Sequence, residues 1–269
     1  KGYNAVKQLL PELKQVFVFD TAFHQTMPDY AYMYALPYQY YTEDHIRRYG
    51  AHGTSHRYVT QRSAEVFGQL PKRLITCHIG NGASISAVLD GKCIDTSMGL
   101  TPLEGLMMGT RTGDIDSSAI LTIMKKEGLT PDEANDLLNK KSGLLGVTGI
   151  SSDMREVEKA SREGNERATL ALKMYNYRIR KYIGTYAAAL GGVDALVFTA
   201  GVGEHQWDVR EGALEGLEFL GIELDKEKNK ANNGEEEIIS TPSSRVKVAV
   251  IPTDEEWMIA SDTLALVNA

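Results

Sequence analysis

The chain of 269 residues is 42% hydrophobic and 24% charged, an ordinary globular composition that suffices for one large domain or two smaller ones. Its 36 acidic and 29 basic residues leave a net charge of -7, which disfavours nucleic acid or an anionic membrane as the main partner, and we expect neither. The two cysteines, Cys77 and Cys93, suit neither a disulfide framework nor a metal cluster. With no apolar run of membrane-spanning length and no secretory signal pattern, we expect a reducing, cytoplasmic setting.

The first part of the chain predicts a helix, a short strand and a tyrosine-rich stretch. Residues 1–15 have a helical pattern that ends near Pro11, and the apolar residues 16–19 predict a strand that stops at Asp20. Because the chain begins on a helix without an initiator methionine, we expect it to be a fragment. Residues 30–49 contain seven tyrosines, which we expect to serve as packing and interface surface before a helix at 56–68.

The middle and end of the chain alternate strands with helices. A strand from Leu74 runs into a Gly-Asn-Gly break, and the alternating pattern after it closes on Asp90-Gly91, which predicts a type I′ hairpin. Thr130 with Glu133 predicts a capped helix, and a single long helix is expected at 152–190. Further strands are expected at 194–199 and 246–251. This alternation favours an α/β architecture whose chemistry lies at the strand ends.

Three glycine-bearing turns follow predicted strands, at 80–82, 109–114 and 201–203. Glycine permits positive φ and a close approach of backbone N–H groups to phosphate oxygens. One such turn is weak evidence, because glycines end strands in many α/β proteins. Three together favour a nucleotide or another phosphorylated ligand, although none fits the Walker or dinucleotide pattern.

Several charged residues stand where they could act on such a ligand, each with a structural alternative. Asp20 could cap the next turn, or orient substrate or a hydrated Mg²⁺. His52 lies in a glycine-flanked turn beside polar residues. Arg111 could present its guanidinium to a carboxylate or phosphate, or could form an ion pair with Asp114 or Asp116.

Two further pairs are undecided from residue chemistry alone. Asp153 and Arg155 could be a helix cap and a surface charge, or could hold a ribose and base. Glu255 and Glu256 suit the first turn of a helix, and a metal role for either is not visible from their position.

The same segments, read as strings, resemble the acetate kinase family. They are, in chain order, FDTAFHQTMP, YGAHGTSHRYV, CHIGNGASI, TPLEGLMMGTRTGDID, SDMREVE, FTAGVGE and IPTDEEWMIA, and they cover essentially the entire chain. The resemblance implies an α/β, actin-like or ribonuclease H-like fold with a cleft between two domains, and usually a homodimer. Residues 1–20 and a C-terminal helix at 254–269 would belong to the first domain, and 21–253 to the second, nucleotide-binding and dimerisation domain.

The resemblance also implies a reaction and a set of roles. The reaction is reversible, direct in-line phosphoryl transfer from ATP to acetate, giving acetyl phosphate and ADP, with Mg²⁺ or Mn²⁺. Asp20 would orient substrate and metal, His52 and Arg111 would stabilise the transferring group, and Glu255 would hold the metal. The residues that would bind the nucleotide are His78, Ile79, Gly80, Asn81, Gly82, Asp153, Met154, Arg155, Gly201, Val202, Gly203, Glu204 and His205. Acetate is already a carboxylate, so no general base is required.

The sequence departs from the family in three ways. The family has a further segment with a phosphate-binding turn before the position of Lys1, so we expect weak nucleotide binding and little kinase activity from this chain alone. Ala51 stands where phenylalanine is common, which would make room for propionate or butyrate, and His205 stands where asparagine is usual. The alternatives are therefore a propionate or butyrate kinase, or a non-catalytic nucleotide-binding and dimerisation module.

Overall fold

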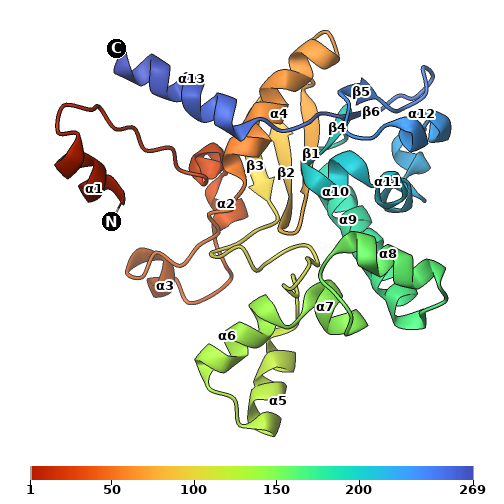
Figure 1. Ribbon diagram of the computed structural model, residues 1–269, viewed down its shortest axis with the longest axis horizontal. Helices are drawn as coiled ribbons and strands as arrows, with labels where there is room; N and C mark the ends of the chain where they lie inside the picture. Colours follow the sequence, from red (N-terminus) through yellow and green to blue (C-terminus); the bar gives the residue numbers. More distant parts are fainter. Residues whose placement is uncertain (1, 269) are drawn as a thin grey trace.

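The computed structural model describes residues 2–268 and is built around one mixed six-stranded sheet in the order β3-β2-β1-β4-β6-β5 (Figure 1). Strands β1, β4 and β6 are parallel, whereas β2 is antiparallel to β1 and β3, and β5 is antiparallel to β6. The strands are β1 (Arg73–Ile79), β2 (Ala83–Leu89), β3 (Lys92–Thr96), β4 (Ala195–Thr199), β5 (Glu237–Ile238) and β6 (Lys247–Val250). The expected α/β architecture is confirmed.

The hairpin between β2 and β3 has the predicted turn. Asp90 and Gly91 both have positive φ, 48° and 77°, and Leu89 pairs with Lys92 across the turn. Two central residues with positive φ define the type I′ turn, whose twist matches that of the strands. The local Asp-Gly signal is sufficient here because the turn depends on those two residues alone.

Helices cover both faces of the sheet. On one face Ile75, Cys77 and Ile79 of β1 belong to the core that contains the buried side of α9 (Glu166–Ala189). On the other face Leu74 packs in a smaller core with Val59 of α4 (Gly53–Val66). Alternate residues of β1 therefore face opposite helical layers, as the two-residue period of a strand requires.

The single long helix predicted at 152–190 is in fact two helices. Helix α8 (Met154–Arg162) ends before Gly164, which has a φ of 90°, and the Asn165 side chain accepts the Ala168 N–H at the start of α9. A glycine in the left-handed region stops one helix, and an asparagine N-cap starts the next. The apolar face expected after the break is confirmed, because Ala168, Ala171, Tyr175, Ile179 and Tyr186 are buried.

The strand predicted at 16–19 is wrong. These residues are extended without a strand partner within the described range 2–268, and Phe17 and Phe19 are 61% and 67% exposed. The helix before them is present as α1 (Gly2–Leu9). Residues 14–17 and the end of α13 (Glu255–Val267) border one shallow cavity, and Lys14 Nζ donates to the Val267 carbonyl at 2.7 Å. Lys1 and Ala269, the ends of the predicted terminal segments, lie outside the described residues.

The remaining helices connect the strands and the longer helices. Thr130 and Glu133 form the predicted capping box of α6, and Figure 1 shows α5 and α6 projecting away from the sheet. Helix α4 begins at Gly53, three residues before the predicted start. The other helices are α2 (Asp29–Tyr32), α3 (Gln39–Thr42), α5 (Ser117–Glu127), α6 (Pro131–Lys140), α7 (Gly143–Thr148), α10 (Ala200–His205), α11 (Trp207–Leu214) and α12 (Lys226–Ala231).

The tyrosine-rich stretch has packed and exposed members. The Tyr32 and Tyr41 hydroxyls lie 3.0 Å apart, and the Arg47 guanidinium lies 3.5 Å from the centroid of the Tyr32 ring. Tyr30 and Tyr38 are 85% and 63% exposed. The packing expected of these tyrosines is confirmed, and their service as an interface stays a prediction.

Across residues 2–268, no helix combines the length and the apolar character needed to cross a bilayer.

Candidate active site

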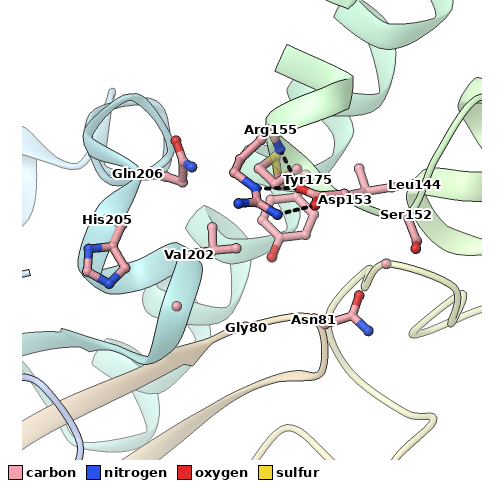
Figure 2. A pocket seen from close by; sticks show the side chains of 13 residues that line it. Gly80, Asn81, Leu144, Ser152, Asp153, Arg155, Tyr175, Val202, His205 and Gln206 are labelled. Atoms are coloured by element: carbon pink, nitrogen blue, oxygen red, sulfur yellow. Dashed lines mark hydrogen bonds and ion pairs between the residues drawn. The ribbon is translucent and has the colours of Figure 1, made fainter. Parts of the chain in front are cut away.

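A cavity of about 630 Å³ opens at the carboxyl ends of β1 and β4. Figure 2 shows its side chains converging from the β1–β2 turn, the start of α8, and helix α10 with the residue after it. Parallel strands end at the same edge of the sheet, which is where open α/β sheets bind ligands. The lining residues are Gly80, Asn81, Gly109, Leu144, Ser152, Asp153, Met154, Arg155, Tyr175, Gly201, Val202, His205 and Gln206.

Eight of the thirteen residues proposed from the resemblance for nucleotide binding line this cavity: Gly80, Asn81, Asp153, Met154, Arg155, Gly201, Val202 and His205. Sequence reasoning missed Gly109, Leu144, Ser152, Tyr175 and Gln206. Gly109 lies in one of the three glycine segments, whereas Tyr175 shows only the spacing of an apolar helix face. No sequence pattern distinguishes a tyrosine that fills the core from one that also forms a cavity wall.

The other five residues, His78, Ile79, Gly82, Gly203 and Glu204, do not line the cavity. Ile79 is fully buried in the core, and the buried His78 places its Nδ1 2.8 Å from the Ser55 hydroxyl. Gly82 faces a different group, described below, and Gly203 lies in α10 against β1. The Glu204 carboxylate is occupied by protein donors. These positions support the cavity without lining it.

Glycine does not supply the unusual backbone that the sequence suggests. Of the glycines in the three turns, only Gly113 has a positive φ, 68°, and 201–203 is the first turn of α10. The strained residue there is Ala200, with a φ of 65°. The glycines instead allow close contact: a side chain at Gly109 would collide with the Asn81 amide oxygen.

The Glu204 side chain stabilises the transition from β4 to α10. Its Oε1 accepts the Ala200 N–H at 2.7 Å and the Thr253 N–H at 3.1 Å. It thereby links the end of β4 to the segment after β6. Its contacts are those of a positioning residue for the cavity edge.

Asp153 combines the two roles that the sequence leaves open. Its carboxylate caps α8 by accepting the Arg155 N–H at 2.9 Å, and it pairs with the Arg155 guanidinium at 2.6 Å (Figure 2). The hydrogen bond from the Arg155 side chain lowers the pKa of this carboxyl. Both side chains also line the cavity, so the pair is a cap that presents a fixed polar edge to a ligand.

A second group of functional side chains surrounds Gly82. A Cβ placed on Gly82 would lie 3.4 Å from Arg111 Nη1 and 3.5 Å from His52 Nε2, so both side chains flank this glycine. Gly80 and Asn81, its neighbours in the same turn, line the cavity. One turn therefore joins the cavity to the Arg111 and His52 group.

Arg111 carries its charge without a carboxylate partner among residues 2–268. Its Nη1 donates to the Pro102 carbonyl at 3.2 Å. The expected alternative of an ion pair is wrong, because Asp114 lies 3.5 Å from Arg178 and Asp116 caps α5. A guanidinium with few internal partners is suited to an anionic ligand.

Asp20 fixes the strained backbone of His52. His52 has a φ of 57°, and its N–H donates to Asp20 Oδ2 at 2.6 Å, while the Thr54 N–H donates to Oδ1 at 3.3 Å. The Gly53 N–H donates to the Asp20 carbonyl at 2.8 Å. Asp20 is therefore a helix cap, although for the distant helix α4 and not for the next turn.

The His52 ring is held neutral. It stacks on His78 with centroids 4.0 Å apart, and its Nδ1 lies 2.9 Å from the Ser84 hydroxyl. Burial lowers the pKa of His52 to about 4, with Asp20 acting in the opposite direction and Arg111 in the same direction. Burial likewise lowers the pKa of His78 to about 3. Near pH 7 His52 is thus a hydrogen-bond donor or acceptor and not a cation.

Glu255 lies near Asp20 in this group. It is half-buried in the first turn of α13, and its pKa is raised by burial and then by the Asp20 charge. No group of three or more His, Cys, Asp or Glu side chains arranged to hold a metal occurs within residues 2–268. A pair of carboxylates suits Mg²⁺, which binds through one or two carboxylates and keeps several waters. The donor set therefore fits a water-rich divalent cation.

Comparison with known proteins identifies the family to which the chain is similar. The model of the acetokinase family matches residues 1–261. An acetate kinase of Phocaeicola vulgatus is 67% identical over 100% of this chain and 68% of its own length, and one from Caldanaerobacter subterraneus is 62% identical over 100% of this chain and 67% of its own.

Two solved structures share the fold. The acetate kinase of Porphyromonas gingivalis has a TM-score of 0.96 at 56% identity, covering 99% of this chain and 67% of its own. A propionate kinase of Francisella tularensis has a TM-score of 0.90 at 46% identity, covering 96% of this chain and 66% of its own. The expected actin-like, ribonuclease H-like fold is confirmed, and the chain belongs to the acetokinase family.

Proposed function

We propose that this chain transfers a phosphoryl group reversibly between ATP and acetate, giving acetyl phosphate and ADP. The family to which it belongs is one of phosphotransferases with a carboxyl group as acceptor. The observation that carries the proposal is the turn at 80–82, because it lines the cavity on one side and is flanked by Arg111 and His52 on the other. A nucleotide in the cavity would thus direct its terminal phosphate toward those two side chains.

The residues of the cavity suit adenosine and its phosphates. Leu144, Tyr175 and Val202 give apolar surface, and the paired Asp153 and Arg155 give a fixed polar edge for ribose and base. Ligand pockets commonly combine apolar walls with a few placed polar groups. Binding here would use backbone and side chains that are already held in place.

Phosphoryl transfer mainly requires alignment and positive charge around the equatorial oxygens. Arg111 supplies a cation, and His52 supplies a neutral imidazole beside the same glycine, Gly82. The acetate carboxylate needs no deprotonation before it attacks, so no side chain is assigned as general base. We infer direct in-line transfer between the nucleotide and the acceptor.

Asp20 and Glu255 are the residues that we propose to hold Mg²⁺ or Mn²⁺. A divalent cation bound there would neutralise charge on the phosphates. The half-buried Glu255, with a pKa raised by burial and by Asp20, would be ionised more completely in the presence of such a cation.

We propose the family's homodimer and a cytoplasmic location as well. The dimer is supported by Leu170, Met174 and Tyr177, three apolar side chains of α9 that are 52%, 41% and 58% exposed. The division into a first domain of 1–20 and 254–269 and a second domain of 21–253 also stays a proposal. It is supported by the contact of Lys14 with the end of α13.

Replacing Arg111 by alanine tests the proposed reaction. We expect Arg111→Ala to lower kcat for acetyl phosphate formation by about a hundredfold or more, because a donor to transition-state charge is lost. The calorimetric Kd for Mg-ATP should change by less than about threefold, since Arg111 is not a lining residue of the nucleotide cavity. Arg245→Ala removes an exposed arginine that donates to the Leu220 carbonyl, and serves as the matched control.

The same assay separates the alternatives. Acetate should be the preferred acceptor over propionate and butyrate, in accord with relatives named acetate kinase at 57% to 67% identity and a propionate kinase at 46%. A preference for butyrate would favour the larger acyl pocket suggested by Ala51. Mg-ATP binding without turnover on any of the three acids would favour a non-catalytic nucleotide-binding module instead.

A further inference from the structure

A buried chain of hydrogen-bonding side chains runs from His52 into the layer between α4 and the sheet. His52 Nδ1 lies 2.9 Å from Ser84 Oγ, which lies 2.8 Å from His56 Nε2. His56 Nδ1 in turn lies 2.7 Å from Thr76 Oγ1. Ser84, His56 and Thr76 are all 0% exposed, so water does not compete for their hydrogen bonds. This relay of hydrogen bonds, from His52 through Ser84 and His56 to Thr76, crosses from the N-cap of α4 to β2, back to α4 and then to β1.

The Ser84 hydroxyl couples the two imidazoles. A hydroxyl has one hydrogen, and because Ser84 is fully buried this hydrogen has an acceptor only when the hydroxyl donates to one ring nitrogen and accepts from the other. His56 is fully buried, and burial lowers its pKa well below the ordinary value, so its ring is neutral and carries a single proton. It follows that a proton sits either on Nδ1 of His52 or on Nε2 of His56, and not on both.

Thr76 decides between these two arrangements. If His52 carries its proton on Nδ1, then Ser84 donates to His56, and His56 donates to Thr76. The Thr76 hydroxyl hydrogen is then left buried without an acceptor in the described part of the chain. In the reverse arrangement Thr76 donates to His56, His56 donates to Ser84 and Ser84 donates to His52, so the hydrogens of the three fully buried side chains all have acceptors. The one remaining N–H, on Nε2 of His52, faces Gly82.

We propose that Thr76, His56 and Ser84 are positioning residues that hold His52 in the tautomer with its proton on Nε2. This is the nitrogen that lies beside Gly82 on the side shared with Arg111. In the proposed function, on which the role of this proton rests, His52 then donates a hydrogen bond to the transferring phosphoryl group. A buried donor without an acceptor disfavours the other tautomer by about tenfold to a hundredfold.

Nuclear magnetic resonance reads the tautomer directly. In the full chain at pH 7, long-range correlations between ring nitrogens and ring protons distinguish a protonated from a bare nitrogen. We expect His52 to show a protonated Nε2 and a bare Nδ1, and His56 to show the same pattern. A protonated Nδ1 on His52 in the unmodified chain would overturn the proposal.

Variants at the far end of the relay test its direction. Thr76→Val keeps the shape of the side chain but removes the donor, so we expect a detectable fraction of His52 to shift to the Nδ1 tautomer. We expect kcat to fall by about tenfold while the KM for ATP stays within about twofold. Thr76→Ser restores the hydroxyl and should restore both the tautomer and the rate. An unchanged tautomer in Thr76→Val would contradict the relay.

A matched pair on β2 guards against a purely structural effect. Ser84→Ala removes the shared hydroxyl, whereas Ser86→Ala removes a hydroxyl that is equally buried but lies 2.9 Å from Thr96 Oγ1. Only Ser84→Ala should change the His52 signals. If the unmodified chain has the Nε2 tautomer but makes no acetyl phosphate, then the proposed function is contradicted. The proposal that Thr76, His56 and Ser84 fix the tautomer of His52 is still supported in that case.

Discussion

Two residues at the site have a left-handed backbone, and a carboxylate holds each of them. Asp20 accepts the N–H of His52, whose φ is 57°, and Glu204 accepts the N–H of Ala200, whose φ is 65°. Such a conformation is uncommon for residues other than glycine and persists only when the surroundings impose it. Each carboxylate therefore contributes to the site by fixing the start of a helix, α4 or α10.

Gly82 is the residue whose missing side chain matters most for the proposed chemistry. Its φ is not positive, so alanine can adopt its backbone, but the added Cβ would lie 3.4 Å from Arg111 Nη1 and 3.5 Å from His52 Nε2. We expect Gly82→Ala to lower kcat by about tenfold or more, because it occupies space that the transferring group needs. Rate assays and urea unfolding should show a loss of rate without a comparable loss of stability.

Gly184→Ala is the control for this change. Gly184 lies in α9 with open space beside it, and a Cβ at this position would have no neighbouring heavy atom within 4 Å. The substitution should raise the free energy of unfolding by up to about 1 kcal/mol and leave the rate unchanged. A Gly82→Ala enzyme with full activity would show that the Arg111 and His52 group does not enclose the reacting atoms.

At the scale of single residues, the sequence predicts which residues are candidates for the site better than it predicts the contacts that they make. For Asp20 it allows either a cap or a ligand-orienting role, and the structure shows the cap, but on a helix that begins 33 residues later at Gly53. For Arg111 it allows an ion pair with its neighbours, yet those aspartates are used elsewhere. Contacts between residues distant in the chain depend on the tertiary fold, and residue types at one position do not encode them.

Helix α10 is held at its far end by a buried arginine. Arg210 is 0% exposed and donates from Nη1 to the Gly203 and Glu204 carbonyls at 3.0 and 2.6 Å. Its Nε donates to Asn229 Oδ1 at 2.7 Å, and burial lowers its pKa to about 10. These carbonyls belong to the last turn of a helix, where they lack partners within the helix. With Glu204 at its start, α10 is fastened at both ends beside the cavity.

Helices α8 and α11 meet through two acidic side chains. Burial, and then the charge of Asp208, raises the pKa of Glu158 to about 7. Arg162 lies 3.8 Å from Glu158 and 3.5 Å from Asp208 but is itself exposed. The Gln206 amide lies 3.1 Å from the Glu158 carboxylate when its nitrogen faces Glu158. The charged form of Glu158 is therefore disfavoured in the folded protein.

This pair predicts a pH dependence of stability. An acid whose pKa is higher in the folded state retains a proton that the unfolded chain has lost, so stability falls as pH rises from about 4.5 to about 7. Glu158→Gln cannot ionise and should be about 1 to 3 kcal/mol more stable than the unmodified chain at pH 8, with a smaller difference at pH 5. Urea unfolding at the two pH values measures this.

Glu163→Gln, at the exposed C-cap of the same helix, is the control and should change neither value by more than about 0.5 kcal/mol. Equal stability of Glu158→Gln and the unmodified chain at pH 8 would mean that Arg162 and Gln206 compensate the buried charge fully.

Elements with a local signal are predictable from the sequence, and those that depend on neighbours are not. The Asp90-Gly91 turn and the Thr130 capping box each need only a few adjacent residues, and both are present. The apolar residues 16–19 have the composition of a strand but pair with no strand in the described chain. The break at 163–165 escapes prediction because the apolar periodicity continues on both sides of it.

The whole molecule brings the site together from distant parts of the chain. The cavity takes residues from 80–81, 109, 144, 152–155, 175, 201–202 and 205–206. The fold class follows from the alternation of strands and helices, and the family follows from seven collinear segments. The order β3-β2-β1-β4-β6-β5 and the cavity walls cannot be read from either, because they depend on which strands become neighbours.

The parallel pairing of β1 with β4 has a consequence for the order of folding. Residues 80–194 lie between these two strands, whereas β2 and β3 are joined by a two-residue turn. Closing the long connection costs chain entropy before its contacts form, so pairing across it should be slow. In pulsed hydrogen exchange during refolding, we expect amides of the β2–β3 hairpin to be protected before those of β4.

Because Gly80 follows β1 and Gly201 follows β4, the cavity should form only when this late pairing is complete. ADP added during refolding should therefore slow unfolding of the finished protein without accelerating its formation. Acceleration of refolding by ADP, or protection of β4 as early as the hairpin, would contradict this order. The nucleotide would then act on the protein only as a ligand of the completed sheet, and its affinity would report directly on the fraction of chains in which β1 and β4 have met.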